Sequence, residues 1–318
     1  MRRAGGSTTG RTRESVAMLA TVLGATGILL ADGNDAAAAP NRVLVAVTLV
    51  SYVLTAVSIG ILLGTRFWRP GPDALLGGTP WRLPTLVGAA LFGMFIVAGG
   101  VGATIASAVA PPESDPLARA AILTWGGLLG GGSACLVGGI LWSSHPTPAN
   151  ARTPTPLGPS IAGAVVLLLL VVPIVQTVSA LGQLLQTAIS GEQPSPLGHE
   201  TLRLMVDSMG TPGWWAMTAA AAIGAPIVEE IAYRGFVQQS ARRAGVGPVM
   251  ASVLVGGIFA LVHIPALPED SRIAGLSGLL VLGIALGILR ERTGRLLPCI
   301  LAHMGFNAFN LIIASSAG

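Results

Sequence analysis

Five polar residues lie within otherwise apolar segments of the C-terminal third of the sequence. They are Glu229 and Glu230, then His263, then His303 and Asn307. The chain has only 4 His and 14 acidic residues among 318, yet two of each type fall inside these apolar runs. An ionisable group inside a membrane span is energetically costly and is usually retained for function. Their concentration therefore indicates a site that does chemistry.

The first of these segments combines two glutamates with an arginine. On a helix, Glu230 and Arg234 lie four residues apart and can pair, whereas Glu229 points about 100° away from Glu230. Glu229 is then expected to stay unpaired in a poorly solvated place, where a carboxylate is a stronger base than at a surface. The alternative is that both glutamates end the span and meet solvent. Depth argues against it, because Glu229 lies about 18 Å from the end of such a helix at Ala241, where Arg242 and Arg243 mark the interface.

Each of the other two segments contains two polar or aromatic residues that lie one helical turn apart. Phe259 shares a helical face with His263 and is expected to support it, and His303 shares a face with Asn307. From the expected inner ends of their helices, His263 lies about 22 Å along the axis, and His303 and Asn307 about 11 to 17 Å. Each residue alone could be a helix-to-helix hydrogen bond. Their overlapping depths predict one shared site.

These groups together have the chemistry to hydrolyse an amide bond. Glu229 with His263 can polarise a water molecule, and His303 with Asn307 can donate hydrogen bonds to a developing oxyanion. No Ser or Cys accompanies a His in a pattern typical of an acyl-enzyme, and no HExxH zinc motif occurs. We therefore expect no metal and no cofactor. Zinc bound by two His and Glu229 is the less favoured alternative, because an asparagine is a poor zinc ligand.

The composition indicates the environment of this site. Mean hydropathy is +0.73, with 52% apolar and only 10% charged residues, whereas soluble domains have about 25% charged residues. The predicted fold is an all-α, polytopic transmembrane helical bundle, and its 43 glycines favour close helix packing. All 18 basic residues are arginines scattered between apolar runs, which argues against nucleic-acid binding. Cys135 and Cys299 both lie in apolar runs and do not suggest a disulfide framework.

Nine apolar runs approach the length of about 20 residues that a spanning helix needs. They cover residues 15–31, 43–64, 86–109, 121–142, 161–184, 213–238, 248–264, 273–289 and 296–314. Thirteen arginines fall in one set of alternate gaps and four in the other, with Arg234 left out because it lies inside a span, and this asymmetry predicts that the N-terminus lies inside. The first run also resembles a secretory signal peptide, and its cleavage would leave eight spans in the same orientation.

The sequence suggests two membrane regions. The Pro-rich run 144–159 reads as a connector between residues 1–160, with about four spans and no assigned function, and residues 161–318, with about five. The second region holds every group suited to chemistry, from about residue 213 onward. Residues 190–212 are expected to be a surface loop, with a short interfacial helix as the alternative.

Three ordered motifs carry a resemblance to a known family. They are EEIAYR as EExxxR, FALVH as FxxxH and HMGFN as HxxxN, on separate apolar segments. This pattern is similar to that of the CPBP intramembrane glutamic endopeptidases, the CAAX-processing and bacteriocin-processing group, over about residues 213–318. The resemblance implies that Glu229 and His263 activate water, that His303 and Asn307 form the oxyanion site, and that Glu230 and Arg234 support them.

The resemblance further implies membrane-associated peptide or protein substrates in a lipid bilayer. The signal-like N-terminus and all-arginine composition look bacterial, which suggests the bacterial cytoplasmic membrane. Two other classes are weighed against the protease. A non-catalytic scaffold or chaperone would not need all four catalytic groups. A transporter that uses Glu229 as a proton site would be expected to show a matching charge in its first half, and no span there contains one.

Overall fold

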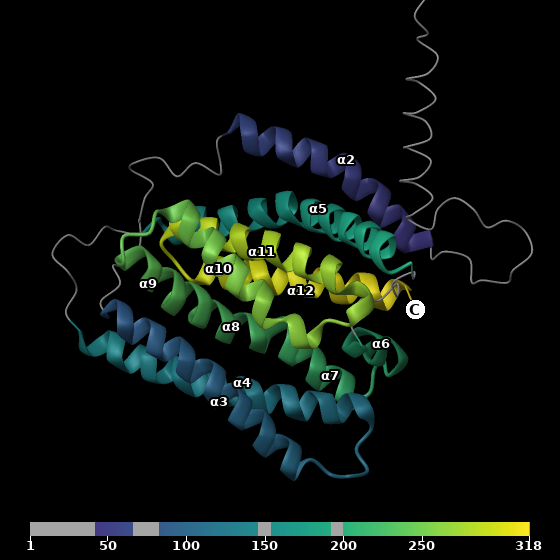
Figure 1. The fold of residues 1–318 in the computed structure, drawn as a ribbon, viewed down its shortest axis with the longest axis horizontal. Helices are drawn as coiled ribbons and strands as arrows, with labels where there is room; N and C mark the ends of the chain where they lie inside the picture. Colours follow the sequence, from purple (N-terminus) through teal and green to yellow (C-terminus); the bar gives the residue numbers. More distant parts are fainter. Residues whose placement is uncertain (1–41, 66–82, 146–153, 192–199, 318) are drawn as a thin grey trace, which may run out of the picture.

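The computed structural model describes residues 42–65, 83–145, 154–191 and 200–317 of the chain (Figure 1). These residues form helices and turns and contain no strand, which confirms the predicted all-α class. Eight helical runs in the described part are long and apolar enough to cross a membrane. They correspond to the last eight of the nine predicted spans. The first, 15–31, lies outside the described residues.

The described residues form helical elements of very different lengths. In chain order they are α2 (Arg42–Gly64), α3 (Thr85–Val109), α4 (Pro116–Ser144), α5 (Leu157–Ser190), α6 (Glu200–Asp207), α7 (Pro212–Ala219), η1 (Ala220–Gly224), α8 (Ala225–Glu230), η2 (Ile231–Val237), α9 (Gln238–Arg243), α10 (Pro248–Val262), η3 (Ile264–Ala266), η4 (Glu269–Ser271), α11 (Arg272–Thr293) and α12 (Leu297–Ala317). The elements from α7 to α9 form one continuous run, in which η1 and η2 are π-helical.

Local sequence explains where several helices begin and end. Asp115 accepts hydrogen bonds from the backbone of the first turn of α4, and Pro116 occupies its first position. Thr211 caps α7 in the same way, ahead of Pro212. These are typical helix starts, because such side chains satisfy orphan N–H groups and proline lacks one. Helix α11 ends at Gly294, whose φ of 67° suits glycine.

Two connections differ from the prediction. Helix α5 already begins at Leu157, so the end of the supposed Pro-rich connector is helical. Proline is tolerated there because the first turn of a helix has unpaired N–H groups in any case. The stretch expected to be a surface loop contains helix α6, whose Met205 is only 4% exposed against the bundle. Burial of one apolar face is what makes so short a helix stable.

The long run from α7 to α9 lies in the middle of the bundle (Figure 1). Helices α3 and α4 pack side by side on one flank of it, with α3 against η2 and α4 against α7. Helices α10, α11 and α12 lie on its other flank, followed by α5 and then α2. The elements that carry the three motifs, α8 with η2, α10 and α12, are thus neighbours in the interior.

Close helix packing, which the glycine content predicts, is present at two crossings. A Cβ atom on Gly102 of α3 would collide with the carbonyl group of Gly126 on α4. At the crossing of α10 and α11, a Cβ on Gly256 would stand 2.8 Å from the backbone nitrogen of Ile284, and one on Gly283 would stand 2.7 Å from Cα of Gly256. Real Cβ atoms do not approach backbone so closely, so any side chain here must push the helices apart.

The variant Gly256→Ala is therefore expected to lower the free energy of unfolding by about 1–3 kcal/mol. Gly257→Ala is the matched control, because a Cβ there meets nothing within 4 Å, and alanine is the better helix former. Thermal unfolding can be followed with a thiol-reactive dye, since Cys135 and Cys299 are free and buried. Equal stability of the two variants would contradict the close approach of α10 and α11.

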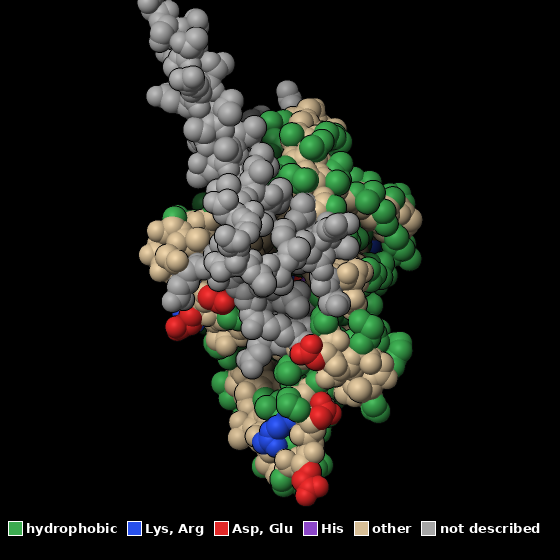
Figure 2. Space-filling view, turned by 90° about the vertical axis from the view of Figure 1, so that its right-hand side faces the viewer, with side chains coloured by type: hydrophobic (Ala, Val, Ile, Leu, Met, Phe, Trp, Pro, Cys, Tyr) green, Lys and Arg blue, Asp and Glu red, His purple; other side chains and the backbone are tan. Residues whose placement is uncertain are grey.

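The two ends of the bundle carry different charges. Arg242 and Arg243 close α9, and Arg290, Arg292 and Arg295 surround the junction of α11 and α12, at the left-hand end in Figure 1. Figure 2 looks onto the other end, where acidic side chains (red) are prominent. This asymmetry agrees with the alternation of arginines along the sequence. The orientation in a membrane, with the arginine-rich end inside, stays a prediction.

Candidate active site

The two consecutive glutamates sit at the centre of the long run. Glu229 and Glu230 are the last residues of α8, between the π-helical segments η1 and η2. Single π-helical turns within α-helices are frequent at functional sites, because they change the direction in which the following side chains point. The sequence alone showed no sign of these two segments.

Glu229 lies between two imidazole rings. One carboxylate oxygen is 3.9 Å from Nε2 of His263, and the other is 3.9 Å from Nε2 of His303. The Glu229 side chain is 20% exposed, whereas those of Glu230 and Arg234 are fully buried. Distances of 3.9 Å are too long for direct hydrogen bonds. They leave Glu229 as the accessible carboxylate, with both rings close to the same side chain.

Glu230 has a different set of partners. Its Oε1 atom accepts a hydrogen bond from Arg234 at 2.8 Å and lies 2.9 Å from Nδ1 of His303. Arg234 also donates to the backbone carbonyl of Gly283 on α11 at 3.0 Å. The expected pairing of Glu230 with Arg234 is thus present. It ties α12 and α11 to the central run, because one buried network includes all three.

The tautomer of His263 follows from its backbone contact. His263 directly follows α10, and its Nδ1 atom is 2.7 Å from the carbonyl oxygen of Phe259. A carbonyl oxygen can only accept, so Nδ1 carries the proton. The neutral ring therefore turns the lone pair of Nε2 towards Glu229. His303 likewise carries a proton on Nδ1, because the carboxylate of Glu230 accepts a hydrogen bond from it.

Phe259 packs among the groups of the site. Its ring, 1% exposed, lies 4.6 Å from the ring of His263 and 5.7 Å from that of His303. The guanidinium of Arg234 stands over the same ring at 5.1 Å, and Tyr233 contacts its edge. Phe259 therefore restricts the orientations of both histidines and stabilises the Arg234 guanidinium through a cation–π contact.

Asn307 lies one turn beyond His303 on α12, as its spacing predicts. Its Nδ2 atom donates a hydrogen bond at 2.8 Å to the carbonyl of Ala221 in η1. The amide group has two hydrogens, so this bond uses one and orients the other. The structure places Asn307 beside η1, so of the four residues predicted to be catalytic, Glu229, His263 and His303 form the compact cluster.

Two backbone groups belong to the site although sequence reasoning missed them. The carbonyl of Gly283 accepts from Arg234, and that of Ala221 accepts from Asn307. Every residue carries a backbone carbonyl, so neither had a signal in its residue type. The only indirect hint at Gly283 was the frequency of small residues in its segment, which is typical of close helix contacts.

Metal binding was considered for the described part of the chain. Within residues 42–65, 83–145, 154–191 and 200–317, no group of three or more His, Cys, Asp or Glu side chains is arranged as a metal site. The zinc alternative needs Glu229, His263 and His303 to converge more closely, because zinc bonds to nitrogen and oxygen are about 2.0–2.2 Å. The prediction of no metal stays untested.

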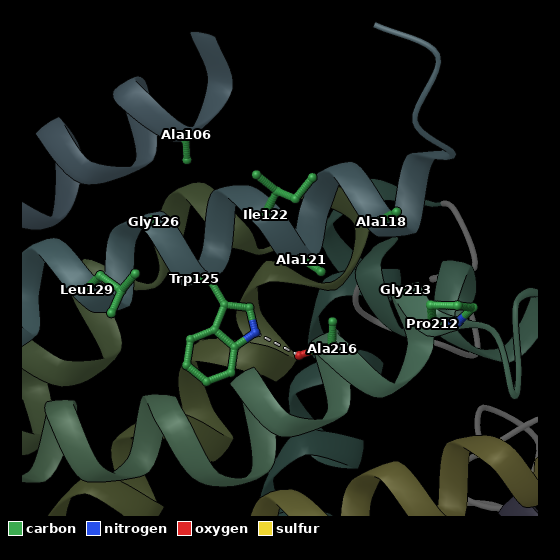
Figure 3. A pocket seen from close by; sticks show the side chains of 10 residues that line it. All are labelled: Ala106, Ala118, Ala121, Ile122, Trp125, Gly126, Leu129, Pro212, Gly213 and Ala216. Carbon is green, nitrogen blue, oxygen red and sulfur yellow. Dashed lines mark hydrogen bonds between the residues drawn. The ribbon is translucent and has the colours of Figure 1, made fainter. Parts of the chain in front are cut away.

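An apolar pocket of about 460 Å³ lies away from these residues (Figure 3). It is formed by α3, α4 and the start of α7, and Trp125 projects into it and donates to the carbonyl of Ala216 at 3.0 Å. Its lining contains no titratable side chain. This pocket therefore has no chemistry of its own.

Comparison with known families adds an independent finding. Residues 211–309 match the family model described as type II CAAX prenyl endopeptidase, Rce1-like. Comparisons with curated proteins and with solved structures give no match. The matched segment is less than a third of the chain and contains all three motifs, from Glu229 to Asn307. It thereby supports the family resemblance of those motifs: over residues 211–309, the chain is similar to the Rce1-like type II CAAX prenyl endopeptidases.

Proposed function

We propose that the protein is a membrane-embedded endopeptidase in which Glu229 and His263 activate a water molecule and His303 and Asn307 stabilise the oxyanion. The Rce1-like match supports a membrane peptidase of CAAX-protease type. The observation that carries the finer proposal is the position of Glu229, with its two oxygens 3.9 Å from the Nε2 atoms of His263 and His303.

The first step of the reaction is attack by water. A water molecule between Glu229 and His263 donates its hydrogens to a carboxylate oxygen and to the Nε2 lone pair. Two acceptors on one water leave its oxygen lone pairs free for the substrate carbonyl carbon. As the C–O bond forms, one proton passes to Glu229 and the carbonyl oxygen becomes an oxyanion.

The second step is the collapse of this intermediate. His303 in its imidazolium form carries protons on both ring nitrogens, so it donates from Nδ1 to Glu230 and from Nε2 to the oxyanion. The remaining amide hydrogen of Asn307 is the second donor. When the C–N bond breaks, the proton held by Glu229 passes to the leaving amine. Glu230 and Arg234 position His303 and do not touch the substrate.

The substrates that fit this proposal are membrane-associated peptides or proteins. They reach Glu229 from the bilayer or from the arginine-rich end, which faces the cytoplasm in the predicted orientation. A bacterial cytoplasmic membrane is the proposed location. The matched family model is described as a CAAX prenyl endopeptidase. The experiment below therefore includes peptides with and without a prenyl group.

The proposal can be tested with the purified full chain in detergent. The measurement is its cleavage of a panel of quenched fluorescent peptides. The panel contains prenylated, acylated and unmodified peptides, and the Glu229→Gln variant, purified identically, is the background. We expect the wild type to cleave at least one lipidated peptide and the variant to show only background. Equal cleavage by both proteins would refute the assigned site. Cleavage of no member of a broad panel would favour the scaffold or chaperone alternative.

The zinc-dependent protease is the second candidate, because Glu229, His263 and His303 are ligand types that zinc takes. A chelator separates the two mechanisms. The glutamate mechanism predicts an unchanged cleavage rate after incubation with a chelator and its removal. Loss of activity that zinc alone restores would assign the site to a metalloenzyme.

A further inference from the structure

A second pocket of about 460 Å³ lies at the arginine-rich end of the bundle. Its walls come from the last turns of α4, from η2 and from the junction of α11 and α12. Arg290 and Arg295 line it together with apolar side chains such as Trp142, Phe236 and Leu297. The four residues proposed to be catalytic do not line this pocket, so it has no part in the chemistry described above.

Arg290 is the unusual member of this lining. It is only 5% exposed, and its Nε atom has no hydrogen-bond partner in the described part of the chain. Among the described residues, no carboxylate lies within ion-pair distance of its guanidinium group. A buried charge without a partner is strongly destabilising. A guanidinium in this state is therefore ready to bind an anion.

The adjacent carboxylate of Glu291 attracts the Arg290 charge, but it is not within ion-pair distance of the Arg290 guanidinium. Glu291 is buried, and its two oxygens are engaged elsewhere, with Gln238 at 2.8 Å and with Arg242 at 3.3 Å. The second arginine of the pocket, Arg295, is held at the wall by donating from Nε to the carbonyl of Thr155 at 2.6 Å. The pocket thus has two guanidinium groups and no acidic residue in its lining.

The remaining walls favour a ligand with an apolar part. Gly139 and Leu297 are exposed on the outer surface of the bundle beside Arg290, where a membrane protein meets lipid. Helix α11 ends at Thr293 and α12 begins at Leu297, so opposite ends of two helix dipoles meet at this junction and the arginines supply the attraction for an anion. The junction of α11 and α12 lies at the end predicted to face the cytoplasm. Polar heads of lipids in the inner leaflet reach this depth.

We propose that this pocket binds the phosphate group of an anionic phospholipid, with Arg290 as its main partner and Arg295 as the second. The guanidinium fork suits phosphate oxygens, which it can contact with two parallel hydrogen bonds. The first part of each acyl chain lies along Trp142, Phe236 and Leu297. A headgroup with a quaternary ammonium binds more weakly, because two arginines repel its positive charge.

Thermal unfolding of the full chain in neutral detergent measures this binding, because a ligand of the folded state raises the unfolding temperature. The titrants are dihexanoyl phosphatidylglycerol, dihexanoyl phosphatidylcholine and inorganic phosphate. We expect a saturable rise with phosphatidylglycerol and a much smaller rise with the other two. Arg290→Gln should weaken the apparent affinity for phosphatidylglycerol at least about tenfold, as expected for hydrogen bonds to a charged group.

Three further variants, one in the pocket and two controls, keep the result independent of the folding of Arg290→Gln. Gly139→Leu fills the mouth of the pocket, where a Cβ meets nothing within 4 Å, and should weaken binding by a similar factor. Gly93→Leu on α3 and Arg292→Gln on α11 are the matched controls, since neither residue lines the pocket. Both controls should bind like the wild type.

Each other result contradicts the proposal. Unchanged affinity in both pocket variants would exclude the pocket as the binding site. An equal loss in Arg292→Gln would show that binding follows net charge alone. A rise with inorganic phosphate as large as that with phosphatidylglycerol would assign the pocket to small free anions instead of lipid.

Discussion

Replacing Glu229 by glutamine is expected to lower the rate of peptide cleavage by about 10²–10⁴-fold, the usual contribution of a general base. Glutamine has the size of glutamate and can hydrogen-bond a water molecule, but it cannot take the water's proton. Glu229 is 20% exposed and makes no direct hydrogen bond to His263 or His303 at 3.9 Å. Its neutralisation should therefore leave the unfolding temperature close to that of the wild type. The measurements are kcat and KM on a cleaved lipidated peptide, with thermal unfolding in parallel.

Glu269→Gln is the matched control for this prediction. It makes the same chemical change at a residue whose side chain is 90% exposed and pairs with Arg272 at the end of the bundle. Cleavage by Glu269→Gln should be indistinguishable from that of the wild type. If Glu229→Gln retained more than about a tenth of the wild-type rate, Glu229 would not be the base of this mechanism.

Replacing Glu230 by alanine is expected to destabilise the protein by about 3–5 kcal/mol, the usual effect of removing one partner of a buried ion pair. The carboxylate is fully buried and contacts both Arg234 at 2.8 Å and His303 at 2.9 Å. Without it, Arg234 keeps only the carbonyl of Gly283 as an acceptor, and His303 loses the group that orients it. Cleavage should fall as well, because His303 would no longer direct Nε2 towards the substrate.

Arg272→Ala provides the comparison for Glu230→Ala. It removes an exposed pair of 3.5 Å with Glu269, and such surface pairs contribute only about 0–1 kcal/mol. The thiol-reactive dye assay with buried Cys135 and Cys299 measures both variants. A loss in Glu230→Ala no larger than that in Arg272→Ala would mean that the buried network does not hold the central run to α11 and α12.

The helical spans and the pairing of Glu230 with Arg234 could be predicted because both depend on local order. Membrane-spanning helices need long apolar runs, and residues four apart on a helix face the same way. The prediction of a loop before α7 was wrong because the structure of that stretch depends on contacts with distant residues and not on local order. A short helix was only the alternative for this stretch, because helix α6 depends on the burial of Met205 against other helices and the sequence does not show that contact.

In the candidate site, too, some features could be predicted from the sequence and others depended on tertiary contacts. Its residue types and their approximate depth were visible in the sequence, because a carboxylate and two histidines within apolar runs are rare. The partner of each atom was not visible. The Phe259 carbonyl determines which nitrogen of His263 carries the proton, and the Ala221 carbonyl takes one hydrogen of Asn307. Backbone carbonyls have no signature in the sequence.

The sequence by itself determined that this chain forms a helical membrane bundle with Glu229, His263, His303 and Asn307 in its C-terminal third, because hydrocarbon tolerates only apolar helices and rare functional exceptions. Only the tertiary structure decided that Glu229 lies between two imidazoles while Glu230 is buried with Arg234, and that Arg290 lines a pocket without an ion-pair partner among the described residues. Such pairings depend on the rotation and crossing of helices far apart in the chain. Packing of whole helices, and not local spacing, sets those angles.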